Sequence, residues 1–478
     1  GVADGQGIMS GGDIILSPKW VRPKHAARPI SASLVAEHEL RIMRARGQWV
    51  VTHVRGGKVS ADVMVEGRRQ SSVDLSARVH PLIVDGAVIY RTDGGVQARD
   101  LLTGESLWQA HGLPLHRASQ GNTGGLPASL GDAGLYQITA GGGKVFVRYG
   151  FVSRQNTAHV FGGGIGWAGP VPPPGDSAKP AHVDRGPELV ALGVSDGGFA
   201  WGPIGNGHGD DEVIRAGVFA SPPTYHQGRL YIVSLHLERF HLICLDARNG
   251  ELLWRRPVCH SPAIGHPHAG MDTRMMLARV SPPAVSDGRV LVVTNSGIAA
   301  ALDAETGQPL WANHYSSTTN SAGRPGHIPT GSLSRSVNPL IVCGDRLVCL
   351  PTDSENLLAY SVADGELLWS VAREGQQQLS AVGPARLLLS SPGLVVKSTA
   401  DGDSQIRHPD SLGVHGRPAV LADRVRASAD GELISLHLGT KQISHRGLTS
   451  ADGLLGNLVS CEQALVAVVQ EAYVKGIS

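Results

Sequence analysis

Short apolar runs separated by turn residues dominate the chain. Valine, leucine, isoleucine and threonine gather in runs of about five to eight residues, and Gly, Asp, Asn and Pro bound these runs. This rhythm is typical of short strands joined by tight turns. Residues 30–46 are an exception, because their apolar positions follow a helical period and predict one short amphipathic helix. We therefore predict an all-β protein with a helix near its N-terminus.

A motif with tryptophan at a fixed place recurs four times along the chain. Gly precedes each Trp by four residues, and Asp or Ser precedes that Gly by four. Such regular self-similarity is the signature of a repeat architecture. The motif positions are Asp100, Gly104, Trp108, Asp246, Gly250, Trp254, Asp303, Gly307, Trp311, Gly365 and Trp369.

Each part of the motif has a physical role. The Asp or Ser side chain is expected to accept hydrogen bonds from the backbone amides of a turn, and the Gly supplies its positive φ. The Trp begins the next strand and is expected to lie flat against a neighbouring sheet, where it buries a large apolar area. Replacing Trp311 by Ala should then lower the free energy of unfolding by ~3–5 kcal/mol.

The sequence before each motif completes a four-stranded unit. Ser221-Pro-Pro and Ser281-Pro-Pro, with the variants Asn338-Pro and His80-Pro, each begin a short strand, a tight turn and a second apolar strand. The unit is a four-stranded antiparallel meander, which is one blade of a β-propeller. Weaker copies cover residues 134–204, 379–408, 417–447 and 455–477.

The whole chain, residues 1–478, is predicted to be a single β-propeller domain with eight four-stranded blades. Residues 13–22, with Trp20, predict an outer strand that completes the last blade and closes the ring, so that no sheet edge is exposed there. Seven blades is the alternative, because the two units without Trp are hard to divide. Residues 23–79, with the short helix, are predicted to decorate the ring, and residues 152–186 form a Pro/Gly-rich insertion within a blade.

Charge and composition narrow the classes of partner. The chain has 42 basic and 41 acidic residues, which gives no reason to expect nucleic acid or an anionic membrane. No apolar run approaches the ~20 residues of a membrane-spanning helix. The chain begins Gly1-Val2-Ala3-Asp4 without a leader, so we expect a processed form or one domain of a larger protein. The five cysteines show neither CxxC nor CxxCH spacing.

The densest polar stretch is the loop that contains His260, His266 and His268. Imidazoles with the nearby carboxylate of Asp272 form a donor set that transition metals accept. The alternative is an ordered loop whose histidines bond to backbone. A comparable loop spans residues 313–329, and we expect both loops at the mouth of the ring, which is the best place for a ligand.

The form Ala-x-Asp-x-x-Thr-Gly-x-x-x-Trp, complete at residues 98–108 and 301–311, resembles the tryptophan-docking repeat of the quinoprotein (PQQ-type) propellers. The resemblance extends from about residue 80 to the end, plus the closing strand. That family includes PQQ-dependent dehydrogenases and non-catalytic members such as BamB-like lipoproteins of outer-membrane assembly. The alcohol dehydrogenases of the family have adjacent, disulfide-bonded cysteines near the cofactor, and this chain has no adjacent cysteines. No catalytic Asp or calcium-binding set can be matched, so none is carried over.

Because the blade motifs are strong, no chemical motif is recognisable and the termini look cut, we expect a non-catalytic interaction scaffold with an unidentified protein partner, to which no cofactor is assigned and for which PQQ with calcium stays open. The resemblance implies a bacterial periplasmic, cell-envelope or extracellular location. The first alternative is a PQQ- and calcium-dependent dehydrogenase, which requires convergent acidic residues and a stacking Trp on the axis of the ring. The second alternative is a metal-binding or electron-transfer accessory protein that uses His260, His266 and His268.

Overall fold

The structure is a computed structural model that describes residues 49–470 with internal gaps. The gaps are 56–57, 66–67, 71–79, 93–94, 102–104, 111–136, 150–187, 206–208, 238, 261–278, 319–334, 422, 430–431, 448–453 and 462–463. The predicted closing strand at 13–22, the helix at 30–46 and the insertion at 152–186 lie outside the described residues.

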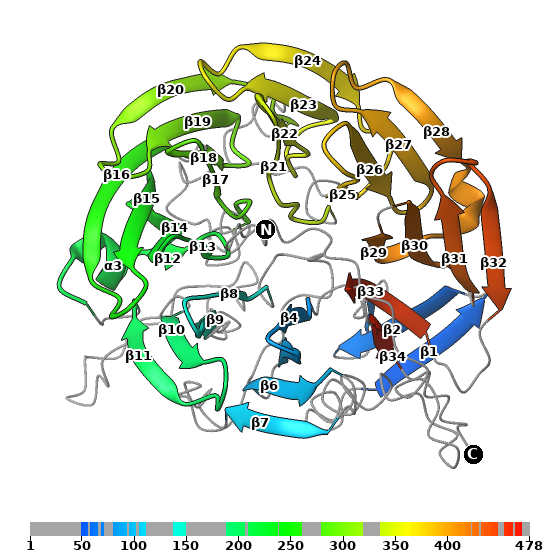
Figure 1. Ribbon diagram of the computed structural model, residues 1–478, viewed down its shortest axis with the longest axis horizontal. Coiled ribbons are helices and arrows are strands. Elements are labelled where there is room, and N and C mark those ends of the chain that lie inside the picture. Colours follow the sequence, from blue (N-terminus) through cyan, green and yellow to red (C-terminus); the bar gives the residue numbers. More distant parts are fainter. Residues whose placement is uncertain are drawn as a thin grey trace, which may run out of the picture.

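Seven four-stranded antiparallel blades stand in a ring around a central axis (Figure 1). This arrangement confirms the predicted β-propeller. Among the described residues the number of four-stranded blades is seven, which was the alternative to the eight predicted first. In every blade the chain runs from an inner strand near the axis to an outer strand on the perimeter. In blade 3 the inner position is shared by two short strands, β12 and β13, which both pair with β14.

The first three blades span residues 82–260. Blade 1 contains β4 (Leu82–Val84), β5 (Ala87–Thr92), β6 (Gly95–Asp100) and β7 (Ser106–Ala110), and blade 2 contains β8 (Thr139–Gly141), β9 (Lys144–Tyr149), β10 (Glu188–Gly193) and β11 (Phe199–Ile204). Blade 3 contains β12 (Val218–Phe219), β13 (Thr224–His226), β14 (Arg229–His236), β15 (Arg239–Asp246) and β16 (Leu252–His260). A short helix, α3 (Glu212–Ala216), precedes blade 3.

The other four blades span residues 284–447. Blade 4 contains β17 (Ala284–Ser286), β18 (Arg289–Val293), β19 (Ile298–Asp303) and β20 (Pro309–His314), and blade 5 contains β21 (Ile341–Cys343), β22 (Arg346–Cys349), β23 (Asn356–Ser361) and β24 (Leu367–Ala372). Blade 6 contains β25 (Gln378–Ala381), β26 (Arg386–Ser390), β27 (Leu394–Ser398) and β28 (Ser404–His408), and a 3₁₀ turn, η3 (Asp410–Leu412), leads to blade 7. Blade 7 contains β29 (His415–Leu421), β30 (Arg424–Ala429), β31 (Glu432–His437) and β32 (Ile443–Gly447).

Strands from both ends of the described chain lie between blade 7 and blade 1 (Figure 1). They are a hairpin, β33 (Leu454–Cys461) with β34 (Ala464–Gln470), and a three-stranded meander, β1 (Trp49–Arg55), β2 (Lys58–Val65) and β3 (Arg68–Gln70). The eight-blade version predicted one four-stranded sheet here. The described residues instead pair as two small sheets, each within its own end of the chain, so seven is the number of four-stranded blades.

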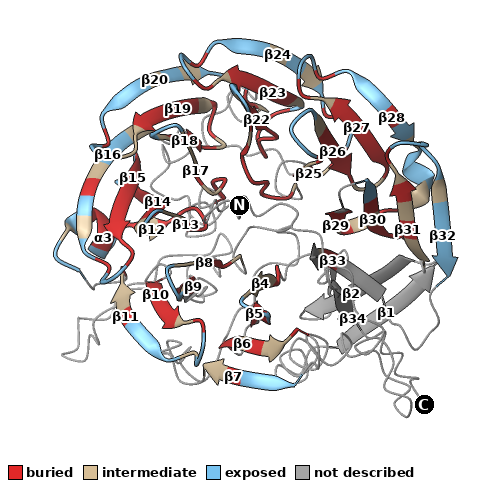
Figure 2. Cartoon of the chain, in the orientation of Figure 1, coloured by how far each residue is buried: buried red, intermediate tan, exposed pale blue. Residues whose placement is uncertain are grey.

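The core lies between the blades and not in one central mass. In blade 4, Leu291 and Val293 of β18 are fully buried and belong to the same apolar cluster as Leu347 of β22 in blade 5. The second and third strands of blades 2 to 6 are buried on both faces, whereas the outer strands are largely exposed (Figure 2). The continuous apolar runs in the sequence are these two-sided strands. Within the described residues, no helix is long and apolar enough to cross a membrane.

Candidate functional site

The repeated turn between the third and fourth strands is held by its acidic residue. Asp303 Oδ1 accepts hydrogen bonds from the backbone amides of Glu305 (3.1 Å) and Thr306 (2.7 Å). Gly307 then closes the turn with a φ of +71°, and its amide donates to the carbonyl of Asp303. Asp246 makes the same kind of bond to the amide of Arg248 at 2.8 Å. Gly104 lies outside the described residues.

Each motif tryptophan docks on the following blade. The indole N–H donates to a backbone carbonyl of that blade: Trp108 to Val194 (2.8 Å), Trp254 to Ala304 (3.3 Å), Trp311 to Val362 (3.0 Å) and Trp369 to Thr399 (3.1 Å). The indole face covers the turn glycine of that blade. A Cβ added to Gly307 would lie 2.5 Å from Trp254 Cε3. Glycine is required there for its φ and for this close approach.

A fifth docked tryptophan, Trp201 of β11, was missed in the sequence. Its indole N–H donates to the carbonyl of Ala247 at 3.0 Å, and its ring covers Gly250. The sequence carried part of the signal, since Gly197 precedes Trp201 by four residues. The position four residues before Gly197 is Gly193, so the acidic member of the motif is missing.

The docking pattern weakens toward blade 7. Ile406 of β28 pairs with Val396 in the register that tryptophan has in other blades. In the facing turn of blade 7, Lys441 takes the glycine position with a φ of +61°. Because isoleucine does not cover the turn as an indole ring does, a residue with a Cβ is accommodated there, although its backbone conformation is still strained.

The predicted metal loop is described only at its first histidine. His260 is exposed at the end of β16, opposite Arg239 of β15. His266 and His268 lie outside the described residues. In the part of the chain that the structure describes, no three His, Cys, Asp or Glu side chains come together to hold a metal ion. The three-histidine site stays a prediction.

The two loops singled out in the sequence occupy equivalent connections. One joins β16 of blade 3 to β17 of blade 4, and the other joins β20 of blade 4 to β21 of blade 5. Each connection runs from an outer strand to the next inner strand, and the described ends of both connections lie at the same end of the ring. We call this end the loop face. The turns between the second and third strands of each blade also lie on it.

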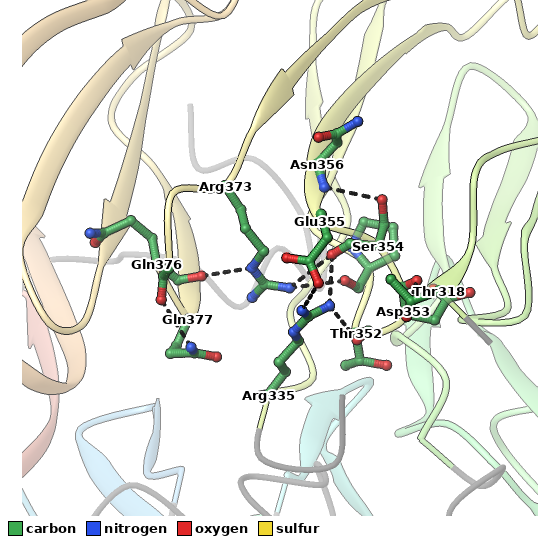
Figure 3. Close-up of polar contacts among 12 residues, drawn as sticks. Thr318, Arg335, Thr352, Asp353, Ser354, Glu355, Asn356, Arg373, Gln376 and Gln377 are labelled. Carbon is green, nitrogen blue, oxygen red and sulfur yellow. Dashed lines mark hydrogen bonds and ion pairs between the residues drawn. The ribbon is translucent and has the colours of Figure 1, made fainter. Parts of the chain in front are cut away.

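A polar cluster occupies the loop face at blade 5 (Figure 3). Arg335 Nη1 donates to the carbonyls of Thr352 (3.2 Å) and Ser354 (2.9 Å), and its Nη2 forms an ion pair with Glu355. These carbonyls belong to the turn between β22 and β23. The guanidinium therefore fixes the shape of this turn from the connection that precedes β21.

A second guanidinium holds the same turn from the opposite side (Figure 3). Arg373, which follows β24 and is 2% exposed, donates to the carbonyls of Pro351 (3.2 Å), Ser354 (3.3 Å) and Gln376 (2.9 Å). Burial lowers the pKa of this arginine, and the charge of Arg335 lowers it further. The two arginines donate most of their hydrogen bonds to backbone carbonyls, which indicates a structural role.

Asp353 lies at the centre of the turn and is 1% exposed. Its Oδ1 accepts a hydrogen bond from the hydroxyl of Tyr315 at 2.8 Å, whereas its Oδ2 is sealed and has no partner among the described residues. Burial raises the pKa of this carboxyl, and this effect outweighs the hydrogen bonds from Ser317 and Tyr315, which lower it. Asp353 is thus a buried acid without a bonded cation among the described side chains.

Polar side chains near the axis tie neighbouring inner strands together. Asn338 Nδ2 donates to the carbonyl of Gln377 at 3.0 Å, and its Oδ1 accepts from the amide of Leu379 at 2.8 Å. The Arg417 side chain of β29 donates to the carbonyl of Leu379 at 2.8 Å. The backbone amide of Arg417 donates to Asn457 Oδ1 of β33 at 2.7 Å. Blades 5, 6 and 7 are therefore cross-linked at the mouth of the ring.

The described donor set fits a PQQ–calcium site poorly. The cluster offers one buried carboxyl, Asp353, in a turn whose backbone carbonyls accept hydrogen bonds from Arg335 and Arg373. Calcium in proteins takes six to eight oxygen ligands, usually with several carboxylates. The described tryptophans with known docking partners lie on outer strands, so none of these five stacks on the axis. Within the described residues, these hydrogen bonds hold the turn in place, and no set of carboxylates points at a common centre.

The outer strands expose a row of apolar side chains, which we call the rim. The residue before the docked tryptophan is an exposed leucine in four blades, and these leucines are 39–52% exposed. They are Leu107, Leu253, Leu310 and Leu368, and Leu367 and Phe199 extend the row. At the equivalent place in blade 6 the residue is Gln405. The apolar row therefore follows part of the perimeter.

Sequence comparisons point to one repeat family. The family model described as outer membrane protein assembly factor BamB matches residues 241–442. Outer membrane protein assembly factor BamB of Vibrio cholerae is 28% identical over 148 residues, which are 30% of this chain and 33% of that protein. The match therefore spans about a third of the length of this relative.

Solved structures with the same general arrangement include BamB from Moraxella catarrhalis, with a TM-score of 0.48 and 15% identity over 82% of this chain and 91% of that chain. They also include quinohemoprotein alcohol dehydrogenase from Comamonas testosteroni, with a TM-score of 0.46 and 13% identity over 80% of this chain and 69% of that chain. Over residues 241–442, and in its Trp–Gly docking contacts, the chain is therefore similar to the BamB-like, PQQ-type repeat propellers.

Proposed function

We propose that this chain is a non-catalytic propeller scaffold that binds a protein partner through its rim, in the envelope of a bacterial cell. The exposed rim leucines are the observation that carries the proposal. Large apolar patches on soluble proteins commonly mark protein-interaction sites, and an exposed leucine recurs at the same position of four blades. The matched relative, BamB of Vibrio cholerae, is named an outer membrane assembly factor, which agrees with an assembly role and an extracytoplasmic place.

The chemistry of the rim favours a protein over a small ligand. β20 (sequence PLWANH) and β24 (LLWSVA) contain no Asp, Glu, Lys or Arg, whereas β28 carries Arg407 and β32 carries Arg446. In the described sheets β20 and β24 each pair with one strand only, so their outer edges are unpaired. Natural proteins usually protect such edges with charge. The uncharged strands of blades 4 and 5 therefore suit contact with another chain.

Site-specific photo-crosslinking in the native host tests this proposal. A photoreactive residue in place of Leu310 or Leu368 should yield a discrete adduct with one protein, and the same residue in place of Gln405 should not. Gln405 is the matched control, because it is exposed and precedes the residue at the tryptophan position of blade 6. Equal labelling at all three positions, or no adduct from the rim, would refute the assignment of the rim.

A second measurement tests the dehydrogenase alternative directly. The purified chain is incubated with PQQ and Ca²⁺, freed of unbound cofactor, denatured and assayed for released PQQ by absorbance and mass. The scaffold proposal expects no retention above that of a protein without the fold. Stoichiometric retention would overturn the non-catalytic assignment and justify a dye-linked dehydrogenase screen.

A further inference from the structure

The segment that leaves blade 4 on the loop face makes three hydrogen bonds to Asp353 of blade 5. Tyr315 donates its hydroxyl hydrogen to Asp353 Oδ1 at 2.8 Å. Thr318 donates its amide hydrogen to the carbonyl of Asp353 at 2.7 Å, and its hydroxyl bonds the same carbonyl at 3.0 Å. Residues 315–318 are therefore hydrogen-bonded to the neighbouring blade at Asp353, and Tyr315 also packs in the apolar cluster shared with that blade.

The two nearby arginines bond the backbone around Asp353 and not its carboxyl group. Arg335 and Arg373 hold the carbonyls on either side of it, at residues 351, 352 and 354, and neither forms an ion pair with its carboxyl in the described structure. The other titratable groups that face the carboxyl are Tyr315 after β20, Cys349 of β22 and Tyr360 of β23. None of these is a cation at neutral pH.

The sealed oxygen of Asp353 decides which protonation state the closed arrangement prefers. Oδ2 has no hydrogen-bond donor among the described residues, and burying an ionised carboxylate without one is costly. A proton on Oδ2 removes the charge and leaves Oδ1 able to accept from Tyr315. When the carboxyl ionises, separation of residues 315–318 from the turn exposes the carboxylate to water, which then solvates its charge.

We propose that Asp353 is a proton-operated latch: its neutral form holds residues 315–318 on blade 5, and its ionisation weakens that attachment. The latch therefore controls the contact between the segment that follows β20 and the turn between β22 and β23 in blade 5. The latch lies on the loop face and not on the rim, so the inference does not depend on the function proposed above.

The direction of the pH effect follows from proton linkage. The open segment exposes Asp353, whose pKa then returns to its ordinary value near 3.8, whereas the pKa in the closed arrangement is raised. Between these two values opening releases a proton, so each unit of rising pH favours opening by up to tenfold. Above the raised pKa both arrangements are ionised and the dependence ends. The latch is therefore tight in acid and loosens as the pH rises.

Hydrogen exchange of the full chain measures the latch. The exchange rates of a peptide that covers Tyr315–Thr318 are followed from pH 4 to 8 and divided by the intrinsic rates, which gives the protection of the Thr318 amide. In the wild-type chain, protection should fall by up to tenfold per pH unit and then level off. In Asp353→Asn, which cannot ionise, protection should not change with pH.

Two further variants make the result decisive. Asp364→Asn is the matched control, because Asp364 is an exposed acid of blade 5 in the turn that leads to β24, and it should keep the wild-type profile. Tyr315→Phe keeps the backbone bond of Thr318 but removes a hydrogen bond that favours ionisation, so the fall should extend to higher pH. Protection independent of pH in the wild-type chain, or an equal fall in Asp353→Asn, would overturn the latch.

Discussion

The contact between an indole and a turn glycine can be tested with two glycines of one blade. Gly288 and Gly307 both belong to blade 4, and both have a φ of +71°. A Cβ on Gly288 would meet nothing within 4 Å. A Cβ on Gly307 would lie 2.5, 2.7 and 2.9 Å from three ring atoms of Trp254. The two substitutions to Ala therefore share their backbone strain and differ in the contact with Trp254.

The expected magnitudes follow from these distances. An alanine at positive φ costs ~1–2 kcal/mol, and this applies at both positions. Carbon atoms pack at about 3.5–4.0 Å, so the indole of Trp254 must move by about 1 Å to admit a methyl group at Gly307. Such overpacking costs a further ~1–3 kcal/mol. Gly307→Ala should thus lower the free energy of unfolding by ~2–5 kcal/mol, and Gly288→Ala by ~1–2 kcal/mol.

Urea unfolding of both variants, alone and combined with Trp254→Ala, separates the two terms. Without the indole, the extra cost of Gly307→Ala should vanish and its effect should equal that of Gly288→Ala, since only the backbone term is left. Trp254→Ala alone should cost ~3–5 kcal/mol and serves as the reference for the cycle. If Gly307→Ala cost no more than Gly288→Ala in the wild-type background, the close approach of Trp254 to that turn would be wrong.

Three further outcomes are expected. Trp311→Ala should lower the free energy of unfolding by ~3–5 kcal/mol in denaturant melts, because the indole covers Gly365 and bonds Val362; a loss under ~1 kcal/mol would contradict the docking. Asp353→Asn should gain stability over the wild-type chain by up to ~1.4 kcal/mol per pH unit as the pH rises from about 4 toward the raised pKa, and a constant difference between the two in thermal melts would refute this. In Asp246→Asn the opposite holds: hydrogen bonds from Arg248 lower the pKa of Asp246 to about 2, so the advantage of the wild-type chain should be present above pH 3.8 and be lost between 3.8 and about 2 in an acid titration of unfolding.

The repeat could be predicted because the interactions that shape it join residues close together in the sequence. Asp303 and Gly307 shape one tight turn, and the distance from Gly307 to Trp311 along the strand is fixed by the backbone. A motif of about ten residues therefore specifies the turn, the strand and the docking side chain together. The sequence also indicated that residues 379–408 form a blade without tryptophan. The alternation of strands and turns continues there, with Ala400-Asp401-Gly402 as a turn.

The candidate site could not be predicted, because it depends on contacts between distant segments. Tyr315 and Asp353 are 38 residues apart, and nothing in their local sequences marks either as a partner of the other. Arg335 and Arg373 look like ordinary basic residues in the sequence, yet both clamp the turn that holds Asp353. The number of four-stranded blades was uncertain for the same reason, since local sequence does not decide whether the two ends of the chain pair with each other.

The alternation of side chains along an outer strand explains why the motif predicts the fold better than the function. Successive residues of a strand point to opposite faces, so the docked Trp311 and the preceding Leu310 face different surroundings. Packing against the next blade constrains the tryptophan position, while the preceding position is in contact with solvent and tolerates Leu310 in blade 4 and Gln405 in blade 6. Selection for a partner can therefore act on the rim without disturbing the ring. In a propeller of this kind, function is consequently expected at positions that the repeat motif does not constrain.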